Sequence, residues 1–135
     1  MAVVVVVDDD PTIQMIAAEL LREGNHAVVS AADGDEALRV LAAMKVDLVV
    51  MDMLMPNKDG LETIIEARGL YPDLRILAIS SGGRVGVGDL LRMARLFGAD
   101  ETYVKPLRLD TFAHTVDRML AEPRPTMDIM VAEAK

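Results

Sequence analysis

Residues 3–10 read Val-Val-Val-Val-Val-Asp-Asp-Asp, a run of five valines that ends in three carboxylates. β-branched residues favour strands, and an apolar run without polar interruptions predicts a strand that is buried on both faces. Such strands are typical of parallel sheets that helices cover on both sides. The three carboxylates therefore stand where a buried strand ends, at one edge of a predicted sheet.

Four further runs rich in aliphatic residues follow along the chain, at residues 27–30, 46–51, 74–79 and 102–104. Between these strands, apolar residues recur every three or four positions, as on the buried face of a helix. Helices are expected from Asp10-Pro11 to a stop at Gly24, and over residues 33–44, 60–69, 89–97 and 109–120. This alternation predicts an α/β fold, a doubly wound parallel sheet of five strands with helices on both faces.

Length and composition indicate a single globular domain. The chain has 135 residues, of which 52% are hydrophobic and 27% charged, and it contains no cysteine. A domain of this size builds one core without disulfides. The formal net charge of -8 repels phosphate backbones and anionic lipids, so nucleic acid and membranes are not expected as direct partners. No signal peptide and no apolar run of about 20 residues is visible, so we expect a cytoplasmic protein.

Polar side chains stand at the ends of four of the five predicted strands. Besides the acids at positions 8–10, Asp52 follows the third strand, Ser80 the fourth and Lys105 the fifth. Doubly wound sheets bind ligands at the carboxyl ends of their strands. In the strand order 2-1-3-4-5 the first and third strands are neighbours, which sets Asp8 and Asp9 beside Asp52. Adjacent carboxylates need a compensating charge, and Mg²⁺ suits a site with few carboxylates and a phosphate oxygen.

Two of these residues have distinct expected roles. Asp10 precedes Pro11, and an Asp before a proline is typical of a helix N-cap. Lys105 lies opposite the acids and is a compact cation suited to added phosphoryl charge, while Ser80 offers a hydroxyl donor nearby. Because Asp carboxylates act as nucleophiles in phosphoryl transfer, the set predicts a site that holds a phosphoryl group on a carboxylate.

Four short motifs occur in order along the chain. They are Val7-Asp8-Asp9, the stretch from Asp47 to Pro56 followed by Asp59-Gly60, Ile79-Ser80-Ser81, and Lys105-Pro106 after Gly98-Ala99-Asp100. Together they resemble the receiver domains of response regulators, the CheY-like family, over nearly the whole chain. The resemblance implies the flavodoxin-like fold, with strand order 2-1-3-4-5.

The resemblance also implies a role for each residue at a strand end. Asp52 is the phosphoacceptor, Asp9 binds Mg²⁺ directly, and Asp8 is a second acid of the metal site that holds a metal-bound water. Three further groups complete the implied site: the backbone carbonyl of Leu54 on the metal, and the side chains of Ser80 and Lys105 on the phosphoryl group. A cis peptide bond is implied before Pro106.

The family implies a phosphoacceptor switch of a two-component system, not an enzyme that turns over a free substrate. A histidine kinase or a histidine phosphotransfer protein supplies the phosphoryl group, and an unknown protein target receives the signal. Residues 1–122 are expected to form the receiver domain, and residues 123–135 a short C-terminal tail without an output domain. The alternative is a receiver domain excised from a larger regulator, such as a DNA-binding transcription factor.

Three other functions fit the sequence less well. A phosphatase of the haloacid-dehalogenase type needs a second Asp two residues after its nucleophile, where this chain has Leu54. The glycines between residues 82 and 88 match neither the P-loop nor the dinucleotide fingerprint, which disfavours a nucleotide-binding module. An interaction module that is never phosphorylated is disfavoured because the acids, Ser80 and Lys105 are all present.

The fifth strand departs from the receiver pattern. Many receivers place Tyr or Phe three residues before the lysine, whereas this chain has Thr102 there and Tyr103 next to it. Because successive side chains of a strand point to opposite faces, we expect the ring of Tyr103 to point away from the usual switch position. The signal is then expected to pass through the glycine-rich loop and the following helix.

Two surface features are also expected on the last two helices. An apolar stripe is expected to pack into the core through Leu109, Phe112, Val116 and Leu120. A basic patch for a protein partner is expected from Arg92, Arg95, Arg108 and Arg118.

Overall fold

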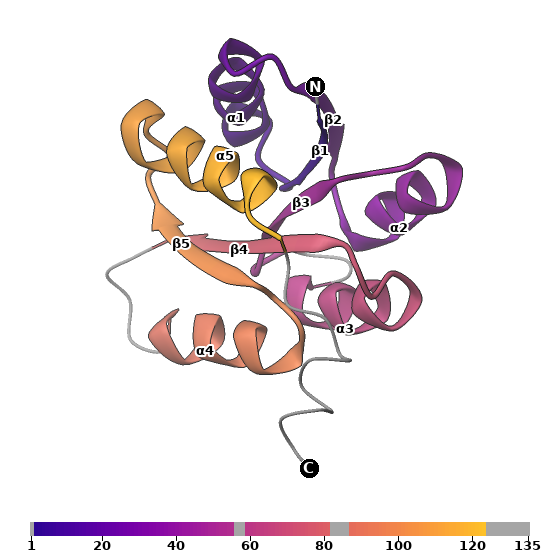
Figure 1. Cartoon of the computed structure of the whole chain (residues 1–135). Helices are drawn as coiled ribbons and strands as arrows, with labels where there is room; N and C mark the ends of the chain where they lie inside the picture. The colour runs from indigo at the N-terminus through magenta and orange to yellow at the C-terminus, as the bar shows by residue number, and fades with distance from the viewer. Residues whose placement is uncertain (1, 56–58, 82–86, 124–135) are drawn as a thin grey trace.

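The computed structural model describes residues 2–55, 59–81 and 87–123. One parallel sheet of five strands has the order β2-β1-β3-β4-β5, as predicted. The strands are β1 (Val3–Val7), β2 (Ala27–Ala31), β3 (Leu48–Asp52), β4 (Arg75–Ser81) and β5 (Glu101–Lys105). The helices are α1 (Pro11–Glu23), α2 (Gly34–Ala43), α3 (Gly60–Leu70), α4 (Val87–Phe97) and α5 (His114–Ala121). Figure 1 shows α1 and α5 on one face of the sheet and α2, α3 and α4 on the other.

Each face of the sheet has its own apolar core. Alternate residues of the central strands point to opposite sides, so Val5, Val49 and Ile76 pack toward α2, α3 and α4. Val4, Val50 and Leu77 pack toward α1 and α5. All six of these side chains are at most 1% exposed. The first, third and fourth strands are therefore central and buried on both faces, which confirms the prediction made for the valine run.

Aspartates begin the three helices that follow β1, β2 and the loop after β3. The side chain of Asp10 accepts a hydrogen bond from the backbone N–H of Thr12 (2.9 Å), which confirms its predicted role as a cap. Asp33 and Asp59 cap α2 and α3 in the same way. An N-cap satisfies a backbone donor that the helix cannot pair by itself. These caps fix where the helices start at the carboxyl edge of the sheet.

The last predicted helix has two parts. A π-helical turn, Leu109–Ala113, leads into α5. Phe112 and Val116 are fully buried, and Leu120 packs partly buried on the same core. Leu109 is 54% exposed, so the prediction that it belongs to the buried stripe is wrong. The reason is the π turn, whose i→i+5 bonding is wider than an α turn and moves Leu109 off the face that carries Phe112.

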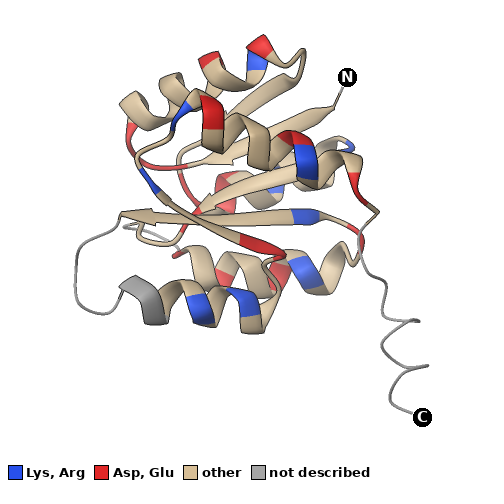
Figure 2. Ribbon diagram, turned by 60° about the vertical axis from the view of Figure 1, so that its left-hand side comes forward, with Lys and Arg blue, Asp and Glu red and all other residues tan. Residues whose placement is uncertain are grey.

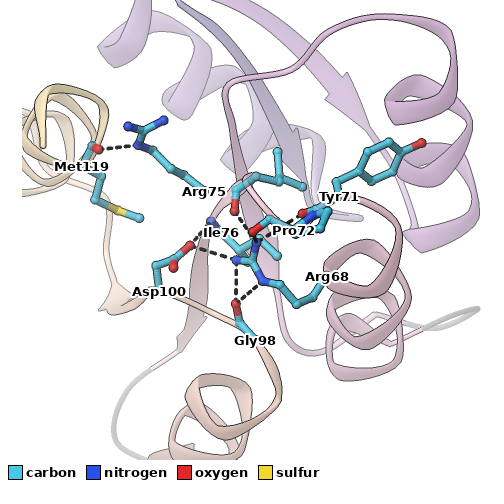
Figure 3. Close-up of polar contacts among 9 residues, drawn as sticks. Arg68, Tyr71, Pro72, Arg75, Ile76, Gly98, Asp100 and Met119 are labelled. Atoms are coloured by element: carbon cyan, nitrogen blue, oxygen red, sulfur yellow. Dashed lines mark hydrogen bonds and ion pairs between the residues drawn. The ribbon is translucent and has the colours of Figure 1, made fainter. Parts of the chain in front are cut away.

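Arg68 lies at the edge of the sheet where the strands begin, away from Asp52. It joins the C-terminal ends of α3 and α4 to the strands that follow them (Figure 3). Its guanidinium donates to the carbonyl of Gly98 from two nitrogens (3.0 and 2.8 Å) and pairs with Asp100 (3.0 Å). Asp100 in turn accepts from the backbone N–H of Ile76 (2.9 Å). The same guanidinium also donates to the carbonyls of Tyr71, Pro72 and Leu74.

Candidate functional site

The carboxyl ends of β1, β3 and β5 bring two acids and a lysine together. The ammonium of Lys105 lies 3.0 Å from Asp8 Oδ2 and 3.6 Å from Asp52 Oδ1. The side chains of Asp8 and Asp52 are only 1% and 7% exposed. Charges in such a shielded place interact more strongly than charges on an open surface. The closer partner of Lys105 in this state is Asp8.

The third acid, Asp9, is exposed and completes a cluster with Asp8 and Asp52. One carboxylate oxygen from each residue lies within 4.8 Å of the other two. Asp8 is held in place because its Oδ1 accepts from the backbone N–H of Asp10 (2.9 Å) and its carbonyl accepts from Gln14 (2.6 Å). Three carboxylates face a single nearby ammonium, so the cluster keeps an excess of negative charge. Hard oxygen donors of this kind suit a divalent cation, and the acidic cluster could hold a metal ion.

Ser80 carries a buried hydroxyl near the carboxyl end of β4. It is fully buried one position before the end of β4, the strand that lies between the strands of Asp52 and Lys105. Its Oγ makes no hydrogen bond within the described residues. Because buried polar atoms are nearly always hydrogen-bonded, this hydroxyl is suited to bind an oxygen of a ligand that enters the site.

The surroundings of Asp52 raise the pKa of its carboxyl above that of a carboxyl in water. Burial raises the pKa of Asp52 to about 6, and the charge of Asp8 acts in the same direction. Lys105 and the backbone N–H of Leu54 lower it by less. For Lys105, burial lowers the pKa, but the hydrogen bond to Asp8 and the charges of Asp52 and Asp8 together outweigh burial and raise it. In neutral solution Asp52 is therefore mostly ionised beside a charged Lys105.

These opposing influences predict how Asp52 titrates without metal. We expect its carboxyl to titrate near 6, to shift upward in Lys105→Met, and to shift downward in Asp8→Asn. Carbon-13 NMR of the side-chain carboxyl measures each value. Lys45→Met is a control, because Lys45 lies at the other edge of the sheet, where it lines a groove between α2 and α3. A pKa of Asp52 in the usual range for aspartate, unchanged in both variants, would contradict this description.

Tyr103 lies on the face of the sheet that α1 and α5 cover. Its ring packs edge-on against Phe112, with centroids 5.6 Å apart and planes at 72°. The hydroxyl lies 2.6 Å from Thr111 Oγ1 and donates to the carbonyl of Pro106. The expectation that this ring points away from the α4 side is confirmed for this state, and its effect on signalling stays a prediction. The peptide bond between Lys105 and Pro106 is cis, as the resemblance implied.

The predicted basic patch is smaller than expected. Arg118 forms ion pairs with Glu101 and with Glu122, so it does not add to a cationic surface. Arg92 and Arg95 are exposed on α4, where Figure 2 shows basic residues, and Arg108 is exposed before the π-helical turn. The prediction is therefore wrong for Arg118, because β5 and the end of α5 place acids beside it.

The match with known proteins defines the family. Residues 4–117 match the sequence model of the response regulator receiver domain, and the chain belongs to this family. It is a receiver domain of the kind found in two-component response regulators. The chain is similar to response regulator MprA of Mycobacterium tuberculosis, with 33% identity over 123 residues. That alignment covers 90% of this chain and 52% of MprA, so the chain spans about half the length of this relative.

Solved structures agree with the family and with the fold. Response regulator protein TrrA from Thermotoga maritima is 32% identical, with a TM-score of 0.77, over 88% of this chain and 99% of that chain. Chemotaxis protein CheY4 from Vibrio cholerae is 28% identical, with a TM-score of 0.79, over 88% of this chain and 98% of that chain. Both share the CheY-like sheet described above.

The structure brings together Asp8, Asp9, Asp52 and Lys105, and it places Ser80 near the carboxyl end of β4, the strand between those of Asp52 and Lys105. Leu54 follows Asp52 closely, and its N–H lies 3.5 Å from Asp52 Oδ1, while its side chain is 58% exposed. The glycine-rich loop singled out above lies largely at residues 82–86, outside the described residues. Over the described ranges, no helix is long and apolar enough to cross a membrane.

Two residues that support the site have no assigned role in the sequence prediction. Gln14 ties α1 to the ends of β1 and β2, because its Nε2 donates to the carbonyls of Asp8 (2.6 Å) and Ala31 (3.2 Å). Gly60 lets α3 approach the end of β3, since a Cβ at this position would lie 2.3 Å from the carbonyl oxygen of Asp52. The pair Asp59-Gly60 was visible as a motif, whereas nothing in the sequence marked Gln14.

Proposed function

We propose that Asp52 accepts a phosphoryl group from a histidine kinase or a histidine phosphotransfer protein, and that the chain passes the change to a protein target. The observation that carries this proposal is the shielded carboxylate of Asp52, set between the ammonium of Lys105 and two further acids. The buried hydroxyl of Ser80, which has no hydrogen-bond partner among the described residues, supports it. The chain acts as a phosphoacceptor switch and not as an enzyme with a free substrate.

The transfer uses the ionised carboxylate of Asp52 as the nucleophile. Its oxygen forms a bond to phosphorus while the bond from phosphorus to the donor's imidazole nitrogen breaks. The electron pair of the broken bond stays on the imidazole, which takes a proton from solvent. Lys105 offsets the charge on the phosphoryl oxygens, and Ser80 donates a hydrogen bond to one of them.

Mg²⁺ is the proposed cation. The carboxylates of Asp8, Asp9 and Asp52 and the backbone carbonyl of Leu54 would hold it, directly or through water. When bound, it supplies positive charge that offsets these acids and the incoming phosphoryl group. The similar protein TrrA has been crystallised in complex with Mg(2+)-BeF, which supports this choice of metal.

Asp9 and Asp10, which follow β1, are expected to differ in role: Asp9 in metal binding and Asp10 in capping α1. We expect Asp9→Ala to weaken Mg²⁺ affinity at least about tenfold, because a carboxylate near the metal is lost. Asp10→Ala should leave the affinity nearly unchanged and lower the free energy of unfolding by about 1 kcal/mol, because α1 loses its cap. Calorimetric titration and urea unfolding measure the two effects. If Asp10→Ala abolishes binding and Asp9→Ala spares it, the assignment of ligand and cap is reversed.

The proposed function is tested with a small phosphoryl donor. Incubation of the full chain with acetyl phosphate and Mg²⁺ should add one phosphoryl group, seen by intact-mass analysis. The same incubation with a chelator in place of Mg²⁺ should add little or none. A chain that gains no mass with donor and Mg²⁺, or gains as much with the chelator, would contradict the proposal.

Residues 1–122 are proposed to work as a stand-alone cytoplasmic receiver, with residues 123–135 as a tail. The alternative, a receiver within a longer regulator, takes support from MprA, of which this chain spans about half. Detection of the native protein by antibody in fractionated cells distinguishes them. A soluble product of 14.7 kDa supports the stand-alone form, and a clearly larger product supports the alternative.

A further inference from the structure

An open groove lies at the edge of the sheet opposite Asp52, between the end of α2 and the end of α3. It encloses about 620 Å³. Its apolar walls include Met44, Leu70 and Tyr71, and Arg75 lies at one side. Met44 is 41% exposed and Leu70 is 65% exposed. Lys45, Asp47 and Asp73 also line the groove, so it offers charged as well as apolar contacts.

The described chain ends beside this groove. Arg75 donates from Nε to the carbonyl of Met119 (2.7 Å), a contact visible in Figure 3, and from Nη2 to the carbonyl of Glu122 (2.9 Å). The same Arg75 also lines a smaller pocket of about 260 Å³ together with Glu122 and Pro123. Twelve residues, 124–135, follow Pro123. Met127 follows Glu122 by five positions, a step that spans up to about 17 Å, enough to enter the groove past Arg75.

The sequence of this tail is largely apolar, with Ile129 and Ala132 on one side at helical spacing and a larger apolar stripe on the other. Met127, Met130, Val131 and Ala134 follow the spacing i, i+3, i+4, i+7, and Asp128, Glu133 and Lys135 fall between them. An isolated helix this short is marginal in water, because it lacks a surface on which to bury its apolar side. The groove therefore offers a surface on which the tail can bury these apolar side chains, and the described chain ends next to Arg75 at the groove.

We propose that the C-terminal tail docks in this groove, with Met127, Met130 and Val131 packed against Met44, Leu70 and Tyr71. The tail then covers the edge of the sheet opposite Asp52 and leaves the phosphoryl site open. It also joins the end of α5 to the ends of α2 and α3, in addition to the contacts that Arg75 makes.

Disulfide trapping in the full chain tests the contact, because the natural chain has no cysteine to interfere. One variant carries Leu70→Cys with Met130→Cys, and its matched control carries Leu96→Cys with Met130→Cys. Leu96 is 76% exposed near the end of α4, as Leu70 is near the end of α3. In a glutathione redox buffer we expect the first pair to close within one chain about tenfold faster than the control, because docking raises the local concentration. Equal rates, or a disulfide that joins two chains, would overturn the proposal.

A second experiment uses the native contact without a cross-link. Tyr103→Phe leaves Tyr71, on the groove wall, as the only tyrosine of the chain. In that background Met130→Asp should change the emission of Tyr71, whereas Ile129→Asp, on the opposite side of the tail, should leave it unchanged. An emission that responds to neither variant, or to both alike, means that the apolar face does not dock there.

Discussion

Replacing Asp52 with Asn is expected to abolish the gain of a phosphoryl group and at the same time to stabilise the metal-free fold. The amide is not a nucleophile, so the transfer loses its acceptor. It also carries no charge, so burial and the repulsion from Asp8 no longer oppose folding. Loss of function with a gain in stability separates the loss of chemistry from a loss of structure.

The size of this gain depends on pH in a defined direction. The pKa of Asp52 is raised from 3.8 to about 6 on folding, so the folded chain binds the proton more tightly than the unfolded chain. Ionisation of Asp52 therefore costs nothing below the unfolded pKa, and the cost grows as the pH rises from 3.8 to about 6. Above that window we expect Asp52→Asn to be more stable by up to about 3 kcal/mol in urea unfolding, because each unit of the pKa shift corresponds to about 1.4 kcal/mol. The exposed Asp73→Asn is the control, and an Asp52→Asn chain less stable than wild type in neutral, metal-free solution would contradict the argument.

Two glycines of α3 should respond in opposite ways to the same substitution. A Cβ at Gly60 would lie 2.3 Å from the carbonyl oxygen of Asp52 and 2.8 Å from the Cα of Met53. Both are backbone atoms, so α3 must move away from β3, and we expect Gly60→Ala to lower the free energy of unfolding by about 2–3 kcal/mol. A Cβ at Gly69 meets nothing within 4 Å, so Gly69→Ala should raise it by about 0.5–1 kcal/mol through helix propensity.

Gly60→Ala should also impair the site, because the displaced backbone carries the acceptor. We expect phosphorylation by acetyl phosphate to slow by about tenfold or more in this variant, since small misplacements of a nucleophile are costly. Gly69→Ala should leave the rate unchanged. Urea unfolding and timed intact-mass analysis give both quantities. Two variants with the same stability and rate would show that the close approach of Gly60 to Asp52 has no consequence.

The parts of the structure that depend on local pattern could be predicted from the sequence. The valines of β1 predicted a strand buried on both faces, and the strand-end rule placed Asp8, Asp9 and Asp52 together. The cap at Asp10 was predictable because its hydrogen bond spans only two residues. Each of these features rests on neighbours in the chain or on the general geometry of parallel sheets.

Features that depend on distant side chains could not be predicted. Arg68 meets Gly98 and Asp100, which lie 30 and 32 residues further along, and no local signal marks such a contact. Arg118 was predicted to belong to a basic patch, but the fold places Glu101 of β5 beside it, and the two side chains form an ion pair. Lys105 was expected opposite the acids as a group, whereas its distances favour Asp8 over Asp52 in this state.

Locating the phosphoryl group on the chain is the most direct test of Asp52 as the acceptor. Borohydride reduces an acyl phosphate to an alcohol, which converts the phosphorylated aspartate into homoserine and marks it permanently. After incubation with acetyl phosphate and Mg²⁺, reduction and peptide mapping should find homoserine at position 52 and nowhere else. Homoserine at Asp8, Asp9 or Asp59, with position 52 unchanged, would contradict the account.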